Sequence, residues 1–255
     1  MSDPLLISSR DNPLLKELRR LSQDSTAYRK AGRFWVEGDH LARAALQRGQ
    51  QPAIAVFAES AWPVFGAEFG VVAARTVLLP DALFDAVSGL EAPTRLGLVF
   101  ALPAAQAVQA GVASVVLDRV QDAGNVGSIL RSASAFGFRQ VIALRGTAAL
   151  WSPKVLRAGM GAHFALHLVE GQEAAAVDGL ALPLLVTSSH QGELVHRQSL
   201  PWPCAWVLGH EGQGVCAELA ARAALAVRIA QPGGEESLNV AAAAAICLHA
   251  SATGR

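Results

Sequence analysis

The sequence predicts an α/β protein built from two domains. Short apolar runs alternate along the chain with helical patterns, which is typical of strands joined by helices. The composition agrees, because 52% of the 255 residues are hydrophobic but only 6% are aromatic. Such a chain can bury a core of its own, which excludes a disordered or collagen-like protein. A weakly patterned stretch at 105–111 is the predicted linker between a domain at 1–104 and a domain at 112–255.

The first domain is predicted to open with a capped helix. Asp11 or Asn12 can cap its N-terminus, and Pro13 suits its first turn. An apolar stripe with helical spacing then follows, at Leu14, Leu15, Leu18 and Leu21. After this helix we expect strands at 34–37, 54–57, 71–74 and 96–101, a helix from Asp39 to about Arg48, and further short helices.

The second domain repeats this rhythm of strands and helices. Residues 112–117 form a continuous apolar run, as in a strand buried on both faces of a sheet. Further strands are predicted at 141–144, 165–169, 184–187, 205–208 and 225–229. Helices are predicted at 126–136, from Ser152 and Pro153 onward, and at 237–250.

Basic residues are concentrated at the start of a chain whose net charge is zero. The 21 basic and 21 acidic residues balance, which argues against a uniformly basic surface. Arginine predominates among the basic residues, and its guanidinium suits bidentate contacts with phosphate. The first 33 residues contain Arg10, Lys16, Arg19, Arg20, Arg29, Lys30 and Arg33. They indicate either a phosphate-binding surface or a solvated helix face.

The sequence favours a cytoplasmic protein that does not span a membrane. It contains no clean stretch of about 18 uncharged apolar residues, and its start lacks the apolar core of a signal peptide. Three cysteines, Cys204, Cys216 and Cys247, are an odd number without close pairing. That pattern suits a reducing compartment and predicts no disulfide framework.

Three polar segments marked by glycine follow predicted strands of the second domain, at 118–131, 208–215 and 229–240. In an open parallel sheet, ligands bind beyond the carboxyl ends of the strands. Each polar residue in these segments also has a simpler interpretation. Asn125, Ser237 and Asn239 could be helix caps, and Glu211 and Arg131 could be solvated surface charges. Their placement at successive strand ends favours a shared site.

Other patterns are weaker indications of chemistry. Residues 212–217 match the G-x-G-x-x-A pattern of a nicotinamide or flavin enzyme, but little chain follows to build the required sheet. His163 and His167 lie four residues apart in a predicted strand, too far from each other to share one zinc ion. The glycines around Met160 indicate a turn that ends a helix. The sequence has no Walker loop, nucleophile elbow or zinc-binding cysteine cluster.

Taken together, the three segments resemble the motifs of the SpoU, or TrmH-type, RNA 2′-O-methyltransferases of the SPOUT superfamily. The first family motif, approximately D-x-V-x-D-P-x-N-x-G-x-I-x-R and then A-x-A-F-G, matches 118–137 with Ala123 in place of proline. The second motif, L-G-x-E-G-x-G, matches 208–214. The third, I-P-x-x-G-x-x-E-S-L-N-V-S, matches 229–241, including Glu236, with Ala230 for proline and Ala241 for serine.

The resemblance implies a fold, a cofactor and partners. It implies a C-terminal methyltransferase domain with a parallel sheet and a deep trefoil knot. The preceding small α/β domain would be similar to RNA-binding ribosomal proteins and would contact RNA through Arg10, Lys16, Arg19, Arg20, Arg29 and Arg33. S-adenosylmethionine would bind in the knot, held largely by main-chain groups, and no metal is expected. The implied cofactor-binding residues are Thr187, Ser188, Gly209, Gly214, Ile229 and Leu238. The enzyme would act as a homodimer.

The implied reaction is methyl transfer to a ribose 2′-hydroxyl of RNA, with 23S rRNA as the expected substrate. Arg131 would fix the hydroxyl and the adjacent phosphate and stabilise developing alkoxide charge. Glu211 would orient Arg131 through an ion pair, and Asn125 would hold the ribose or the arginine. Ser237 and Asn239 would order the third segment. Two alternatives remain: a tRNA 2′-O-methyltransferase, and a catalytically inactive RNA-binding factor for ribosome assembly.

Overall fold

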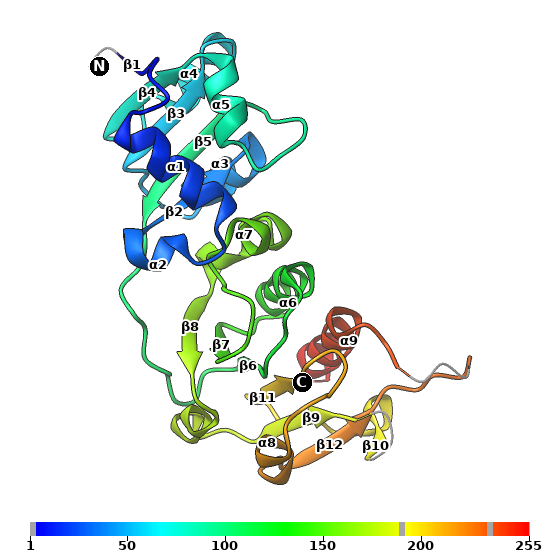
Figure 1. Cartoon of the computed structure of the whole chain (residues 1–255). Helices are drawn as coiled ribbons and strands as arrows, with labels where there is room; N and C mark the ends of the chain where they lie inside the picture. The colour runs from blue at the N-terminus through cyan, green and yellow to red at the C-terminus, as the bar shows by residue number, and fades with distance from the viewer. Residues whose placement is uncertain (1–3, 189–191, 234–236, 255) are drawn as a thin grey trace. The chain divides into compact units, whose positions relative to one another are not determined.

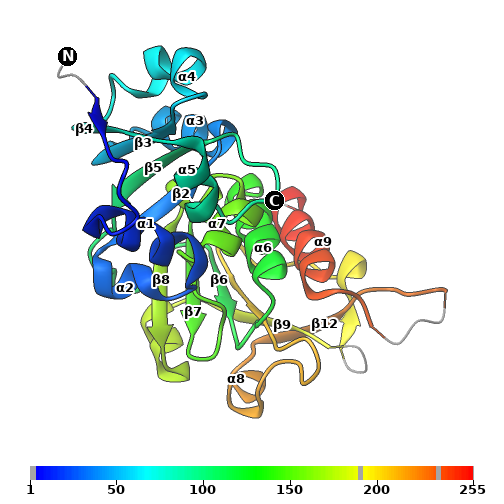
Figure 2. The same ribbon diagram turned by 45° about the horizontal axis from the view of Figure 1, so that its top comes forward.

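In the computed structural model, residues 4–188, 192–233 and 237–254 are described, and the chain divides into two compact units (Figure 1, Figure 2). The first unit contains Met1–Ala104 and Trp151–Phe164, and the second contains Ala105–Leu150 and Ala165–Arg255. Glu236 of the third motif lies outside the described residues.

The first unit is built on a five-stranded mixed sheet in the order β1-β4-β3-β5-β2. β4 runs parallel to β1 and β3, whereas β5 runs antiparallel to β3 and β2. The strands are β1 (Leu5–Leu6), β2 (Arg33–Glu37), β3 (Ile54–Ala58), β4 (Arg75–Leu79) and β5 (Leu96–Ala101). The helices are α1 (Pro13–Gln23), α2 (Ala27–Ala31), α3 (Asp39–Gln47), α4 (Trp62–Phe69), α5 (Asp81–Val87) and α7 (Pro153–Gly159).

The opening helix α1 confirms the predicted cap and stripe. The side chain of Asn12 accepts a hydrogen bond from the N–H of Leu14 at 2.9 Å, and Pro13 is the first helical residue. Leu15, Leu18 and Leu21 are buried.

The strand predicted at 71–74 is wrong, because those residues form turns and the strand is β4, at Arg75–Leu79. Val71 is 55% exposed. Val77 and Leu79 are instead buried in β4, which pairs with β3 on one side and β1 on the other. Pairing on both sides places the strand a few residues later than the apolar run suggested.

Residues 151–164, which the sequence analysis places in the second domain, pack within the first unit. The ring of Phe34 in β2 lies 4.6 Å from that of Trp151, measured between centroids. The ring of Phe164 lies 6.3 Å from Phe34 and 6.2 Å from Phe100 in β5. Aromatic packing therefore recruits a segment that is distant in sequence. The segment contains α7, which ends in the expected turn at Met160, with φ of 46°, and Gly161, with φ of 86°.

The second unit is built on a seven-stranded sheet in the order β10-β12-β9-β11-β6-β7-β8, and all neighbouring strands run parallel. The strands are β6 (Ser114–Leu117), β7 (Gln140–Leu144), β8 (His167–Gln172), β9 (Leu184–Thr187), β10 (Glu193–Leu194), β11 (Ala205–Leu208) and β12 (Leu225–Arg228). The helices are α6 (Ala123–Ala135), α8 (Ala217–Ala221) and α9 (Val240–Thr253). Short 3-10 helices of this unit are η2 (Ala174–Leu180) and η3 (Val195–Arg197), and a third, η1 (Ala162–Ala165), lies where the chain passes from the first unit to the second.

Local capping explains where α6 and α9 begin. The carboxylate of Asp122 accepts a hydrogen bond from the N–H of Asn125 at 2.7 Å, so α6 starts at Ala123 and not at Val126. Asn239 caps α9 in the same way, so this helix starts three residues later than predicted. The strand predicted at 165–169 begins instead at His167, because η1 occupies Ala162–Ala165.

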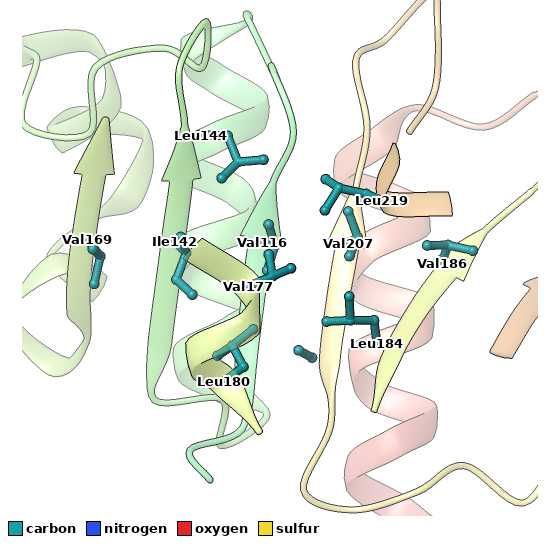
Figure 3. Close-up of a cluster of buried hydrophobic side chains, with 11 residues drawn as sticks. Val116, Ile142, Leu144, Val169, Val177, Leu180, Leu184, Val186, Val207 and Leu219 are labelled. Carbon is teal, nitrogen blue, oxygen red and sulfur yellow. The ribbon is translucent and has the colours of Figure 1, made fainter. Parts of the chain in front are cut away.

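The parallel sheet is covered on both of its faces. Val116, Ile142 and Val207 project from β6, β7 and β11, and Val177 and Leu180 of η2 lie over them (Figure 3). Helices α6 and α9 lie side by side behind the sheet in that view (Figure 1, Figure 3). Burial on both faces explains why β6 has a continuous apolar sequence.

The predicted linker is partly bound to the second unit. The buried side chain of Gln140 accepts a hydrogen bond from the N–H of Gln109 at 2.7 Å and donates to its carbonyl oxygen at 3.1 Å. Nε2 of His167 lies 2.7 Å from the carbonyl oxygen of Ala107. Residues 107–109 are therefore held by side chains of β7 and β8. No helix among the described residues is long and apolar enough to cross a bilayer.

Candidate active site

Three loops meet beyond the carboxyl ends of the parallel strands in the second unit. The first loop (118–122) follows β6, the second (209–216) follows β11, and the third (229–239) joins β12 to α9. β11 lies between β6 and β9, at the point where the strand order changes direction. Such a point is where ligands bind in open parallel sheets. The three loops are the three sequence segments that were predicted to share a site.

Glu211 of the second loop is bound to the first loop by three hydrogen bonds. Its carboxylate accepts from the main-chain N–H of Gln121 at 3.2 Å and from that of Asp122 at 3.1 Å. It also accepts from the side-chain amide of Asn125 at 3.1 Å. These contacts fix the second loop against the start of α6.

The electrostatics of Glu211 reflect these donors. Desolvation raises the pKa of its carboxyl group, but hydrogen bonds oppose this effect. The donors are the Asn125 side chain and the main-chain N–H groups of Glu211, Asp122 and Gln121, and together they bring the pKa down to about 2. Glu211 is therefore ionised at neutral pH and acts as a hydrogen-bond acceptor.

Asn125 and Asn239 join the first loop to the third. The Nδ2 atom of Asn239 donates a hydrogen bond to Oδ1 of Asn125 at 2.9 Å. The Oδ1 atom of Asn239 accepts from the N–H groups of Ala241 and Ala242, at 2.9 and 3.3 Å, and so caps α9. An unbroken chain of hydrogen bonds therefore runs from Glu211 through Asn125 to Asn239.

The second loop folds back on itself and needs glycine at two places. The N–H of His210 donates to the carbonyl of Gly214 at 3.1 Å, and the N–H of Gly214 donates to the carbonyl of His210 at 2.8 Å. Gly214 has φ of 69°, in the left-handed region that favours glycine. A Cβ at Gly209 would lie 2.1 Å from the main-chain carbon of Gly214, so no side chain fits there.

His210 shapes the tip of the same loop. Its Nδ1 atom accepts hydrogen bonds from the N–H groups of Gly212 and Gln213, at 3.0 and 3.3 Å. The 212–217 glycine pattern therefore lies in a closed turn and leads only into the five-residue helix α8. It does not open the long helix on which a dinucleotide pyrophosphate would rest.

The carboxyl edge offers main-chain groups to a ligand. In the part of the chain that the structure describes, the main chains of Gly209, Ile229 and Leu238 form no hydrogen bond with protein atoms. Gly209 is buried, and buried main-chain polar groups are almost always paired. Gly209 therefore fits a cofactor held by main-chain contacts, whereas Ile229 is half-buried and Leu238 is exposed.

The other predicted cofactor residues have different positions. Thr187 ends β9, and the N–H of Ser188 donates to the carbonyl of Val227 at 3.0 Å, which joins β9 to β12. The N–H and carbonyl of Gly214 are used within the second loop. Gly214 therefore shapes the loop, whereas Thr187 and Ser188 lie at the strand ends.

Arg131 lies on α6, six residues after Asn125, and its side chain is exposed. Among the described residues it forms no hydrogen bond or ion pair, and its ion pair with Glu211 stays a prediction. The carboxylate of Glu211 is turned to the neutral donors of the first loop instead. Ser237 is exposed just before the cap of α9.

The predicted RNA-binding residues belong to the first unit, and several are engaged in local ion pairs. Lys16 lies 2.9 Å from Asp11, and Arg33 lies 2.7 Å from Glu17. Nε of Arg29 donates to the hydroxyl of Tyr28 at 3.1 Å. The side chains of Arg10, Arg19 and Arg20 are exposed.

Sequence reasoning missed Arg119, Gln213 and His210, which contribute side-chain contacts to the two loops. All three occupy variable positions of the motif patterns, so the resemblance did not single them out. The only available signal was their location between motif residues. Within the described residues, no group of three or more His, Cys, Asp or Glu side chains is arranged to hold a metal ion.

Comparisons with known proteins match both units. A model of the SpoU rRNA Methylase family matches residues 113–249. The chain is 31% identical over 247 residues to the 23S rRNA (guanosine(2553)-2′-O)-methyltransferase RlmP of Bacillus subtilis, covering 95% of this chain and 97% of that protein. An AdoMet-bound rRNA methyltransferase from Sinorhizobium meliloti superposes with a TM-score of 0.82, at 25% identity and 96% coverage of each chain. A solved RNA 2′-O ribose methyltransferase has a TM-score of 0.80, at 28% identity, covering 97% of this chain and 98% of that chain.

Proposed function

The chain belongs to the SpoU rRNA methylase family, and on this premise we propose that it methylates a ribose 2′-hydroxyl of 23S rRNA with S-adenosylmethionine. The Bacillus subtilis relative is named for this reaction on 23S rRNA, and the similar Sinorhizobium meliloti enzyme binds AdoMet. The observation that carries the proposal is the hydrogen-bonded chain from Glu211 through Asn125 to Asn239. It assembles the three motif loops at one edge of the sheet.

Main-chain groups of Gly209, Ile229 and Leu238 would hold the cofactor, with Thr187 and Ser188 beside them at the end of β9. When bound, S-adenosylmethionine supplies a methyl group activated by the positive sulfonium. Gly214 keeps the second loop closed against Gly209. The residues that meet the RNA must then orient the hydroxyl toward this edge.

Arg131 is the residue that we assign to the reacting hydroxyl. A guanidinium stays protonated in proteins, so Arg131 is a poor general base and a good donor. It would bind the 2′-hydroxyl and the neighbouring phosphate and stabilise negative charge as it develops on the oxygen. Its exposed guanidinium, without a partner among the described residues, is available for this contact.

The remaining polar residues of the site would mainly hold the loops in place; they are Asn125, Glu211, Asn239 and Ser237. Glu211 and Asn125 fix the first turn of α6, the helix that carries Arg131. Asn239 holds the third loop to the same place, and Ser237 is available to the substrate beside it. Each contact restricts the loops to the arrangement in which the hydroxyl can react.

We also infer the finer features that the family resemblance implies. The insertion of β11 between β6 and β9 supports a trefoil-knotted domain. The exposed Ile246 on α9 supports a homodimer through this helix, and the reaction would need no metal. The basic side chains Arg10, Arg19 and Arg20 of the first unit would bind RNA phosphates, in the manner of a ribosomal-protein-like domain. The free cysteines and an rRNA substrate support a cytoplasmic location.

The test is methyl transfer from labelled S-adenosylmethionine to RNA from cells that lack the gene, followed by mapping of 2′-O-methyl groups. We expect one modified nucleotide in 23S rRNA. Arg131→Ala should lower the rate by about 10²–10³, the usual cost of losing one transition-state donor, while cofactor binding persists. Arg139→Ala removes another exposed arginine of the same unit and should leave the rate unchanged.

Three results would contradict the proposal in different ways. Modification of tRNA alone would overturn the choice of substrate and keep the chemistry. Cofactor binding without transfer to any RNA would favour an RNA-binding assembly factor. A normal rate for Arg131→Ala would remove Arg131 from the reaction.

A further inference from the structure

Arg119 has an unusual backbone conformation for its residue type. It follows Asp118 at the end of β6 and has φ of 59°, in the left-handed region that L side chains other than asparagine and aspartate rarely adopt. Backbone strain of this kind persists only where surrounding contacts hold it, and it is concentrated at functional sites. The contacts of the Arg119 side chain therefore need an explanation.

The guanidinium of Arg119 joins the first loop to the second. Its Nε and Nη2 atoms donate to the two carboxylate oxygens of Asp118, at 2.8 and 3.2 Å. Its Nη1 atom donates to Oε1 of Gln213 at 2.8 Å. Asp118 is only 2% exposed, and its Oδ2 atom also accepts from the N–H of Cys216 at 2.7 Å. We call these four residues, Asp118, Arg119, Gln213 and Cys216, the loop clamp.

The loop clamp fixes the part of the second loop that packs against Gly209. Gln213 and Cys216 bracket Gly214 and Val215, whose main-chain atoms lie directly against Gly209. Glu211 holds the same loop at its other end. A shift of Gly214 and Val215 would therefore change the surroundings of the buried main-chain groups of Gly209.

Gly146 leaves space for the aliphatic part of the Arg119 side chain. A Cβ at Gly146, in the loop after β7, would lie 3.1 Å from Cγ of Arg119. Gly146 also has φ of 90°, so glycine suits this position for two reasons. The loops after β6, β7 and β11 thus meet at one side chain.

We propose that Arg119 is a positioning residue for S-adenosylmethionine. By binding Asp118 and Gln213, it holds the second loop in the shape that presents Gly209 to the cofactor. This inference rests on the proposed function. Arg119 differs from Arg131 because its charge is neutralised by Asp118 and its Nη1 is used by Gln213. It therefore acts on the cofactor through the loop, without contacting RNA.

The experiment measures the Kd of S-adenosylmethionine by calorimetry, in the absence of RNA. Arg119→Ala and Gln213→Ala should each raise the Kd by roughly tenfold, the effect of one charge-assisted hydrogen bond. The double variant should bind no more weakly than Arg119→Ala, because that change already removes the contact that Gln213→Ala removes. Gln213→Glu keeps the acceptor and should restore near-normal binding. Arg145→Ala, an exposed arginine paired with Glu173, is the matched control.

Two readouts separate positioning from general destabilisation. At saturating cofactor, kcat of Arg119→Ala should return to within about twofold of the wild-type value, because the chemistry remains intact. Arg119→Gly relieves the backbone strain but removes the side chain, so it should unfold no earlier than Arg119→Ala and still bind the cofactor weakly.

Several outcomes would overturn the inference. They are a normal Kd for Arg119→Ala, additive effects in the double variant, or failure of Gln213→Glu to restore binding. Failure of the wild-type protein to bind S-adenosylmethionine would instead contradict the proposed function itself.

Discussion

At Glu211, a carboxylate is held by neutral donors, the amide of Asn125 and the main-chain N–H groups of Gln121 and Asp122. The sequence predicted that Glu211 and Asn125 share one edge of the sheet, but it paired Glu211 with Arg131. Spacing along the chain shows which residues reach an edge. It does not show which of several donors there will be nearest, because that depends on the backbone path of the first loop.

The low pKa of Glu211 predicts a measurable pH dependence of stability. Its folded-state pKa of about 2 lies below the ordinary value of 4.5, so the ionised group stabilises the fold at pH above 4.5. This stabilisation is lost as the pH falls from about 4.5 towards 2. Glu211→Gln should therefore lose less stability over that range than the wild-type protein, as measured by denaturant unfolding at each pH.

A control and a contrary result complete this test. Glu193→Gln removes an exposed carboxylate from β10, outside the three loops, and corrects for the loss of one negative charge. If the free energy of unfolding falls equally for Glu211→Gln and wild type between pH 4.5 and 2, Glu211 does not form these hydrogen bonds in solution.

At the scale of elements, the capping residues of this site both start a helix and help to join the loops. Asp122 and Asn239 begin α6 and α9, and the two helix starts are joined through Asn125. The sequence predicted both helices and most strands, because apolar periodicity is strong in them. It misplaced the strand at 71–74 and the first turns of the helices, where pairing partners and cap geometry decide the boundary.

Asn239 allows its two tasks to be separated experimentally. Asn239→Ala removes both the cap and the bond to Asn125, and we expect it to lower the free energy of unfolding by about 1 kcal/mol. Asn239→Asp keeps the cap oxygen but cannot donate to Asn125, so it should be more stable than Asn239→Ala. Both variants should lose methyl transfer by about tenfold or more, the worth of one hydrogen bond. Full activity of Asn239→Asp would show that the bond to Asn125 is dispensable.

At the scale of the whole molecule, the two units are not two consecutive stretches of chain. The break near Ala104 coincides with the start of the predicted linker, yet Trp151–Phe164 returns to the first unit. The sequence did not predict that this segment packs on the first unit, because the apolar pattern of a helix does not show which sheet the helix will cover. Its place is identified by contacts within the first unit, among them those of Trp151 and Phe164 with Phe34 and the packing of α7 on β2.

This division predicts the behaviour of fragments. A fragment of residues 1–104 lacks Trp151 and Phe164, which leaves Phe34 and Phe100 uncovered. We expect it to bind a hydrophobic dye and to unfold without a cooperative transition. A matched fragment that carries 151–164 on a Gly/Ser linker should regain cooperative unfolding. A cooperative transition in the shorter fragment would show that the returning segment is not required.

The bond between Asn125 and Asn239 joins residues that are 114 positions apart in the chain. During synthesis, the first loop therefore exists long before the third loop that completes it. Contacts of such long range form late, after shorter-range structure has condensed. A chain that ends within the last strands would keep the contact between Glu211 and Asn125 but would lack the third loop and its bond to Asn125. The bond that joins the third loop to the first can therefore form only after the chain has been synthesised as far as Asn239.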